Sequence, residues 1–278
     1  IIKKGNFAKI FLTMEFFATC NGIPVHIFDS KKGDNCIILL HGYLETLHIW
    51  QEFSTLLEKE LRVVAIDLPG HGLSGTYQVN TMELCAETIV EVMKLLSIKR
   101  GYIAGHSMGG YVASCAVTSY PNLFDALIMI NSTPFADSPE KRDNRDREIE
   151  LIKQNRLQQL VKLSITNMFS PLNISLFEEQ IIEICENAEL HDPEGITSSL
   201  LGMKARPDYS LPLSHSTLPI QFIFGEQDNF ISAEVANKVK SLLPNATYTT
   251  IPNSGHNSFI EQPLPTASTI LNFINNRL

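Results

Sequence analysis

The chain has 278 residues, of which 44% are hydrophobic and 19% are charged, and its formal net charge at pH 7 is −8. This composition is that of an ordinary globular protein, and the length allows one α/β domain with an insertion or two domains. The negative charge argues against nucleic acid and anionic membrane surfaces as partners, since both require clustered Lys and Arg. No apolar run approaches the ~20 residues that span a membrane.

The cysteines are five in number and scattered, without a Cys-x-x-Cys pair: Cys20, Cys36, Cys85, Cys115 and Cys185. This is neither a disulfide framework nor a zinc site. The pattern predicts free thiols in a reducing compartment, and we expect a cytoplasmic protein, either a monomer or a homodimer.

Residues 1–20 admit two interpretations. A basic start followed by an apolar stretch and Cys20 is typical of an export signal. Glu15 interrupts that stretch, however, and Asn21-Gly22 leads into a second strand-like run at 23–28, which favours a β-hairpin. Residue 1 is not Met, and Met14 is one candidate for the native start.

Strands then alternate with helices, which indicates an α/β fold with a mostly parallel sheet and helices on both faces. Continuous apolar runs predict buried strands, and amphipathic spacing predicts the helices between them. The predicted strands are 36–40, 61–66, 102–104 and 127–131, and the predicted helices are 50–57, 81–96 with Thr81 as its cap, and 111–120.

The alternation stops after Asn131, and no strand-like run follows until about residue 210. Apolar residues at helical spacing predict a helical insertion over 132–210. Strands are predicted again at 220–224 and 247–251, and helices at 233–243 and 266–277. We therefore expect a core made of 15–131 and 211–278, with an antiparallel N-terminal hairpin.

The most informative motif is Gly105-His-Ser107-Met-Gly109, which lies between a predicted strand and a predicted helix. A serine on so sharp a turn has a strained backbone that pushes its hydroxyl outward, and glycines on either side avoid collisions across the turn. The N-terminus of the following helix would face an oxyanion. This context predicts that Ser107 is a nucleophile.

A serine nucleophile needs a base and a third group that orients the base. His256 follows the last predicted strand and Asp228 follows the preceding one, and the order Ser, Asp, His is the one expected for such a sheet. Glu226 is the rival acid but lies nearer the strand. The remaining histidines are expected to be structural or solvated: His26, His41, His48, His71, His106, His191 and His215.

An oxyanion hole is expected from two backbone N–H groups. Met108 follows the nucleophile directly, and Tyr43 lies in the loop after the strand that ends at Leu40. Gly42 allows close backbone approach there. The Tyr43 ring would also form a wall of the substrate pocket.

Together these motifs resemble the α/β-hydrolase superfamily, and within it the small capped carboxylesterases, lactonases and proline iminopeptidases. The motifs are His41-Gly-Tyr43, Asp67-Leu-Pro-Gly-His-Gly-Leu-Ser74, Gly105-His-Ser-Met-Gly-Gly110, Gly225-Glu-Gln-Asp228 and Gly255-His256. The resemblance implies a Ser107–Asp228–His256 triad, Tyr43 and Met108 as oxyanion donors, and 132–210 as a cap. It implies no metal or organic cofactor.

We expect a serine hydrolase that cleaves a small to medium, mainly apolar ester, thioester or lactone through an acyl-enzyme. A lyase or C–C bond hydrolase on the same scaffold, or a receptor that retains the triad, are the alternatives. Phe177 and Met203 are the candidate pocket residues among the apolar residues of the insertion, which are Phe169, Leu172, Ile174, Leu176, Phe177, Leu200, Leu201 and Met203. Its arginines, Arg142, Arg145, Arg147, Arg156 and Arg206, are interpreted as surface residues.

Overall fold

The computed structural model describes residues 14–276. Within them one sheet has the strand order β1-β2-β4-β3-β5-β6-β7-β8. Among the described residues, the β1–β2 hairpin is antiparallel, as the sequence predicts, the β2–β4 pair is antiparallel as well, and the remaining pairs are parallel. The strands are β1 (Glu15–Cys20), β2 (Ile23–Asp29), β3 (Cys36–Leu40), β4 (Arg62–Ile66), β5 (Gly101–His106), β6 (Phe124–Ile130), β7 (Ile220–Gly225) and β8 (Thr247–Ile251).

The N-terminal hairpin is present where Asn21-Gly22 predicts it. Both residues have positive φ, 48° and 82°, and they place Cys20 opposite Ile23 in the register. Positive φ at both central residues matches the twist of the flanking strands. Residues 1–13, which carry the rest of the export-signal pattern, lie outside the described residues.

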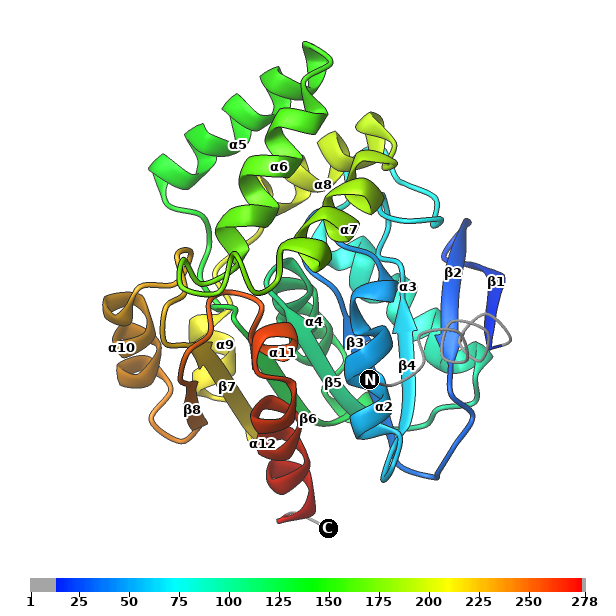
Figure 1. Ribbon diagram of the computed structural model, residues 1–278. Coiled ribbons are helices and arrows are strands. Elements are labelled where there is room, and N and C mark those ends of the chain that lie inside the picture. Colours follow the sequence, from blue (N-terminus) through cyan, green and yellow to red (C-terminus); the bar gives the residue numbers. More distant parts are fainter. Residues whose placement is uncertain (1–13, 277–278) are drawn as a thin grey trace.

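The sheet is covered on both faces (Figure 1). Successive side chains of β3 point to opposite faces, so Ile37 and Leu39 belong to one core cluster and Ile38 and Leu40 to the other. The first cluster contains η1 (Leu47–Trp50), α2 (Gln51–Leu57), α11 (Ser258–Glu261) and α12 (Pro263–Asn275). The second contains α3 (Met82–Leu95), α4 (Met108–Ser119), η2 (Pro121–Leu123), α9 (Ser210–Ser214) and α10 (Ala233–Leu242).

Helix boundaries follow local chemistry. The Thr81 side chain accepts a hydrogen bond from the Leu84 N–H, which confirms the predicted cap of α3. The last helix starts earlier than predicted, with Pro263 in its first turn, because proline has no N–H to lose at that position. Helix α4 also starts earlier, directly after Ser107.

The insertion between β6 and β7 is helical, as predicted. Residues 132–210 contain α5 (Pro139–Lys153), α6 (Leu157–Met168), α7 (Glu178–Glu189) and α8 (Pro193–Ala205). These helices lie together over one end of the sheet (Figure 1). None of the helices in residues 14–276 is both long and apolar enough to cross a membrane.

Candidate active site

Ser107 lies at the turn between β5 and α4, and its backbone is strained. Its φ and ψ are 48° and −113°, which a residue with a Cβ adopts at a cost of about 1–3 kcal/mol. Hydrogen bonds hold this turn in place: the Ser107 N–H donates to the Ile130 carbonyl at 3.1 Å, and the Ser132 hydroxyl donates to the Ser107 carbonyl at 2.7 Å. The surrounding sheet therefore imposes the conformation that presents the serine side chain.

Gly105 explains why the turn needs glycine. A Cβ built on Gly105 would collide with the carbonyl oxygen of Gly109 in the first turn of α4. The strand and the helix therefore approach one another as closely as the motif predicts.

Asp228 and His256 form a buried pair after the carboxyl ends of β7 and β8. His256 Nδ1 lies 2.8 Å from Asp228 Oδ2 and 3.0 Å from Oδ1, and the two residues are 3% and 9% exposed. Asp228 also accepts hydrogen bonds from the Phe230 N–H at 2.8 Å and from Asn131 Nδ2 at 2.9 Å. This arrangement leaves the Nε2 side of the imidazole for a proton from a nucleophile.

The Asp228 carboxyl is held in its ionised form. Burial alone would raise its pKa, but the charge and hydrogen bond of His256 and the Asn131 amide lower the pKa below its ordinary value. Glu226, the rival acid, accepts from the Asn253 N–H instead, at 3.2 Å. Of the two predicted acids, the structure thus brings Asp228 to the histidine.

The His256 loop is tied to the insertion. The N–H groups of His256 and Asn257 both donate to the carbonyl of Met168, the last residue of α6, at 2.7 and 3.2 Å. The buried Glu261 carboxylate adds a second link, since it accepts from the Ser170 N–H at 2.9 Å and from the Gly255 N–H at 2.7 Å. The position of the histidine therefore depends on α6.

Two backbone N–H groups near Ser107 remain available. In the part of the chain that the structure describes, no protein group accepts a hydrogen bond from the N–H of Met108 or Tyr43. Met108 is the first residue of α4, so its N–H belongs to the positive end of the helix dipole. These are the two donors predicted for an oxyanion.

Glu45 is a functional candidate that sequence reasoning missed. Its Oε2 accepts from the Gly42 N–H at 2.6 Å and lies 2.9 Å from His106 Nδ1, while His106 Nε2 lies 3.0 Å from the His256 carbonyl. Burial alone would raise the pKa of Glu45, but His106 and the Gly42 N–H lower it. A Cβ on Gly42 would lie 2.8 Å from His106 Nδ1 and 2.9 Å from Glu45 Oε2. One carboxylate thus connects the Tyr43 loop, the residue before Ser107 and the histidine loop.

We expect Glu45→Gln to lower kcat by about tenfold to hundredfold with a smaller change in KM, because the neutral amide loses the charge-assisted bonds that fix the Gly42–Tyr43 loop. Initial rates and thermal unfolding measure the two effects. The control is Glu52→Gln on α2, where the side chain is exposed. Equal kcat in the two variants would mean that Glu45 does not position the site.

His41 and His26 have structural partners. His41 Nδ1 donates to the Gly42 carbonyl at 2.7 Å, and its Nε2 accepts from the Leu68 N–H at 2.9 Å. His26 lies between the carboxylates of Asp67 and Glu15 at 2.8 and 3.1 Å. Among residues 14–276, no three His, Cys, Asp or Glu side chains come together to hold a metal ion.

The insertion differs from expectation in two ways. Arg145 and Arg206 are not surface residues: the Arg145 side chain is 17% exposed and that of Arg206 is 1% exposed, because both pair with the buried Asp137. Among the apolar residues of the insertion, Leu172 and Leu176 lie largely in solvent, and Leu201 is 37% exposed. Met203 is buried, and Phe177 is half-buried against the Phe169 ring.

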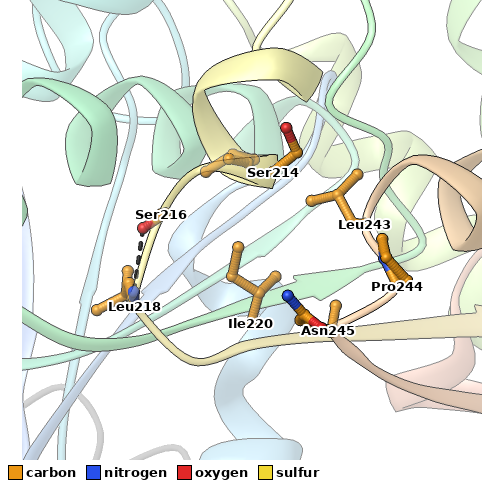
Figure 2. Close-up of a pocket in the computed structure, with 9 residues that line it drawn as sticks. Ser214, Ser216, Leu218, Ile220, Leu243, Pro244 and Asn245 are labelled. Atoms are coloured by element: carbon orange, nitrogen blue, oxygen red, sulfur yellow. Dashed lines mark hydrogen bonds between the residues drawn. The ribbon is translucent and has the colours of Figure 1, made fainter.

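A small hollow elsewhere is not part of this site. It is lined by the start of β7 and by the segments that precede β7 and β8, including Leu218, Ile220 and Leu243, as Figure 2 shows. Ser107, Asp228 and His256 follow the carboxyl ends of their strands and therefore lie at the opposite edge of the sheet.

The family model described as alpha/beta hydrolase fold matches residues 35–263. The chain belongs to the α/β-hydrolase family. This agrees with the sheet order and with the resemblance that the motifs carry, and the model covers every predicted triad and oxyanion residue of this hydrolase.

Relatives of this α/β hydrolase are distant in sequence. A 2-hydroxy-6-oxononadienedioate hydrolase of a Pseudomonas species is 25% identical over 90% of this chain and 91% of its own. A pimeloyl-[acyl-carrier protein] methyl ester esterase of Yersinia pseudotuberculosis is 25% identical over 88% and 95%. The solved structure of a Thermogutta terrifontis esterase has a TM-score of 0.88 at 25% identity, covering 95% of this chain and 98% of its own.

Proposed function

We propose that this α/β hydrolase is a serine hydrolase that cleaves an ester, thioester or lactone of a small to medium substrate through an acyl-enzyme. The observation that carries the proposal is the pairing of His256 Nδ1 with Asp228 at 2.8 Å beside a strained serine turn. His106, the residue before Ser107, contacts the His256 carbonyl, so the nucleophile and the base belong to neighbouring loops.

In the proposed reaction, His256 Nε2 takes the proton of Ser107 as the hydroxyl attacks the acyl carbon. The N–H groups of Tyr43 and Met108 stabilise the oxyanion, and the imidazolium then gives its proton to the leaving group. His256 next activates a water molecule that releases the acyl group. The mechanism uses only the chain's own groups, so we propose no cofactor, and the partner is a small-molecule substrate.

Residues 132–210 form the proposed cap over this site, with Met203 and Phe177 as the proposed apolar contacts of the substrate. The bonds between α6 and the His256 loop support a cap that lies directly over the triad. The buried thiols of Cys20, Cys36, Cys85 and Cys115 support a reducing compartment, and we place the protein in the cytoplasm.

A lyase or C–C bond hydrolase is the second candidate. One observation favours it: a relative named as a synthase, the 2-succinyl-6-hydroxy-2,4-cyclohexadiene-1-carboxylate synthase of Escherichia coli, is 25% identical over 84% of this chain and 91% of its own. Such chemistry would reuse the same triad on a different bond.

Pre-steady-state kinetics with a 4-nitrophenyl ester test the proposal. An acyl-enzyme predicts a burst of nitrophenol close to one equivalent per chain, followed by slower turnover. A lyase without ester hydrolysis, or a receptor that retains the triad, would release no nitrophenol above the uncatalysed rate.

A further inference from the structure

A charged cluster joins the insertion to the loop after β3 and to α4, the helix that follows Ser107. We call it the cap cluster: Tyr43 and Tyr111 from the core, and Asp137, Arg145, Glu148 and Arg206 from the insertion. The Arg206 guanidinium lies 3.7 Å from the centre of the Tyr111 ring, one turn after Ser107. The Arg145 guanidinium lies 6.0 Å from the centre of the Tyr43 ring. The cluster is therefore adjacent to the proposed oxyanion hole.

Three buried oxygen atoms in the cap cluster have no hydrogen-bond partner, and one of them, Asp137 Oδ1, lies 2.9 Å from Arg206 Nη2 in an ion pair. Tyr43 is 6% exposed and its hydroxyl is unpaired. Glu148 Oε2 is also unpaired, and Arg145 Nη1 lies 3.6 Å from it, too far for a hydrogen bond. Buried polar atoms in proteins nearly always have a hydrogen-bond partner. The unpaired Tyr43 hydroxyl and Glu148 Oε2 therefore indicate that a group of a ligand supplies their missing hydrogen bonds.

The charges of the cap cluster cancel when all are ionised, since Arg145 and Arg206 face Asp137 and Glu148. Burial raises the pKa of the Glu148 carboxyl, and Arg145 opposes that rise. At mildly alkaline pH the cluster thus has no net charge to attract an anion. The groups left to bind are a carboxylate acceptor, a hydroxyl that donates or accepts, and guanidinium donors. A neutral group with both a donor and an acceptor fits them.

The position of Tyr43 sets the distance between this subsite and the scissile bond. Its backbone N–H is the proposed oxyanion donor, and its hydroxyl lies at the far end of the same residue. The distance from the oxyanion donor to this hydroxyl is therefore about the length of a tyrosine side chain, which corresponds to roughly five bonds of an extended substrate.

We propose that the cap cluster binds a neutral hydroxyl or amide group of the substrate, roughly five bonds from the scissile carbonyl. Tyr43 and Arg145 donate hydrogen bonds to its oxygen, and the Glu148 carboxylate accepts a hydrogen bond from its O–H or N–H. The inference rests on the proposed ester hydrolysis and names the substrate class of that site: an ester with a remote polar group rather than a purely aliphatic one.

The test compares kcat/KM at about pH 8 for 4-nitrophenyl esters whose acyl chains, of about four to eight carbons, end in methyl, hydroxyl or carboxylate. When the acyl chain is long enough to place its end group at the cap cluster, the wild type is expected to hydrolyse the ester with the hydroxyl ending about tenfold faster than the one with the methyl ending. The ester with the carboxylate ending is expected to be a poor substrate. Glu148→Gln removes one negative charge without changing the volume, so the ratio of carboxylate to hydroxyl rates should rise by about tenfold.

Glu150→Gln is the matched control, because it lies on the same helix and its side chain is 60% exposed. Equal ratios in the two variants, or a wild type that prefers the methyl or the carboxylate ending at every length, would overturn the proposal. A wild type that hydrolyses none of the esters and shows no burst would instead refute the proposed function itself.

Discussion

Replacement of Ser107 by alanine is expected to lower kcat by about 10⁴-fold or more, because it removes the oxygen that would form the proposed acyl-enzyme. Only a hydroxyl is lost, and the hydrogen bonds that hold the turn use the Ser107 backbone rather than its side chain. The melting temperature should therefore stay close to that of the wild type. Steady-state rates and thermal unfolding measure the two expectations.

Ser119→Ala is the control for this variant, since it removes an exposed hydroxyl at the other end of α4. An organophosphonate should label the wild type at Ser107 alone, as shown by mass spectrometry of the modified peptide. Label on another serine, or more than about a tenth of the wild-type kcat in the alanine variant, would place the nucleophile elsewhere.

Asp228→Asn is expected to lower kcat by about 10⁴-fold, although the side chains have the same shape. The carboxylate accepts from His256 Nδ1, from Asn131 Nδ2 and from backbone N–H groups, and an amide nitrogen in its place can accept from none of them. The imidazole would then keep its proton on Nε2, where it must receive the serine proton.

Glu226→Gln provides the comparison within the same loop. Glu226 accepts one exposed backbone hydrogen bond, from Asn253, and does not reach His256, so we expect less than about a tenfold effect. The kcat values of the two variants decide between the acids. A larger loss in Glu226→Gln than in Asp228→Asn would reverse the assignment.

The features that the sequence predicts well are those that depend on neighbouring residues. Apolar runs mark the buried strands, Asn21-Gly22 marks the hairpin, and Gly105 with Ser107 marks the strained turn. Each of these features depends on the burial or the allowed backbone angles of a few consecutive residues, and those are determined by the residue types in a short stretch of sequence. The pairing of Asp228 with His256 also follows, because consecutive parallel strands place their carboxyl ends at one edge.

The features that the sequence does not predict depend on distant partners. Glu45 is a polar residue in a loop until the fold places His106 against it. Arg206 is buried because Asp137, far away in the chain, neutralises it. Leu172 and Leu176 lie in the turns between α6 and α7 and face solvent, whereas Met203 on α8 is buried, and hydrophobicity alone cannot distinguish those outcomes.

The hydrogen bonds from His256 and Asn257 to the Met168 carbonyl also bear on how such enzymes are recombined by protein engineers. A chimera that exchanges only the insertion replaces the Met168 carbonyl, which accepts the hydrogen bonds that fix the His256 loop. The incoming insertion must therefore present a carbonyl in the same position as the one that it replaces. A transplant is best delimited to include both the end of α6 and the segment from Ser254 to Glu261. In this scaffold the insertion and the loop that carries the proposed base are therefore inherited together.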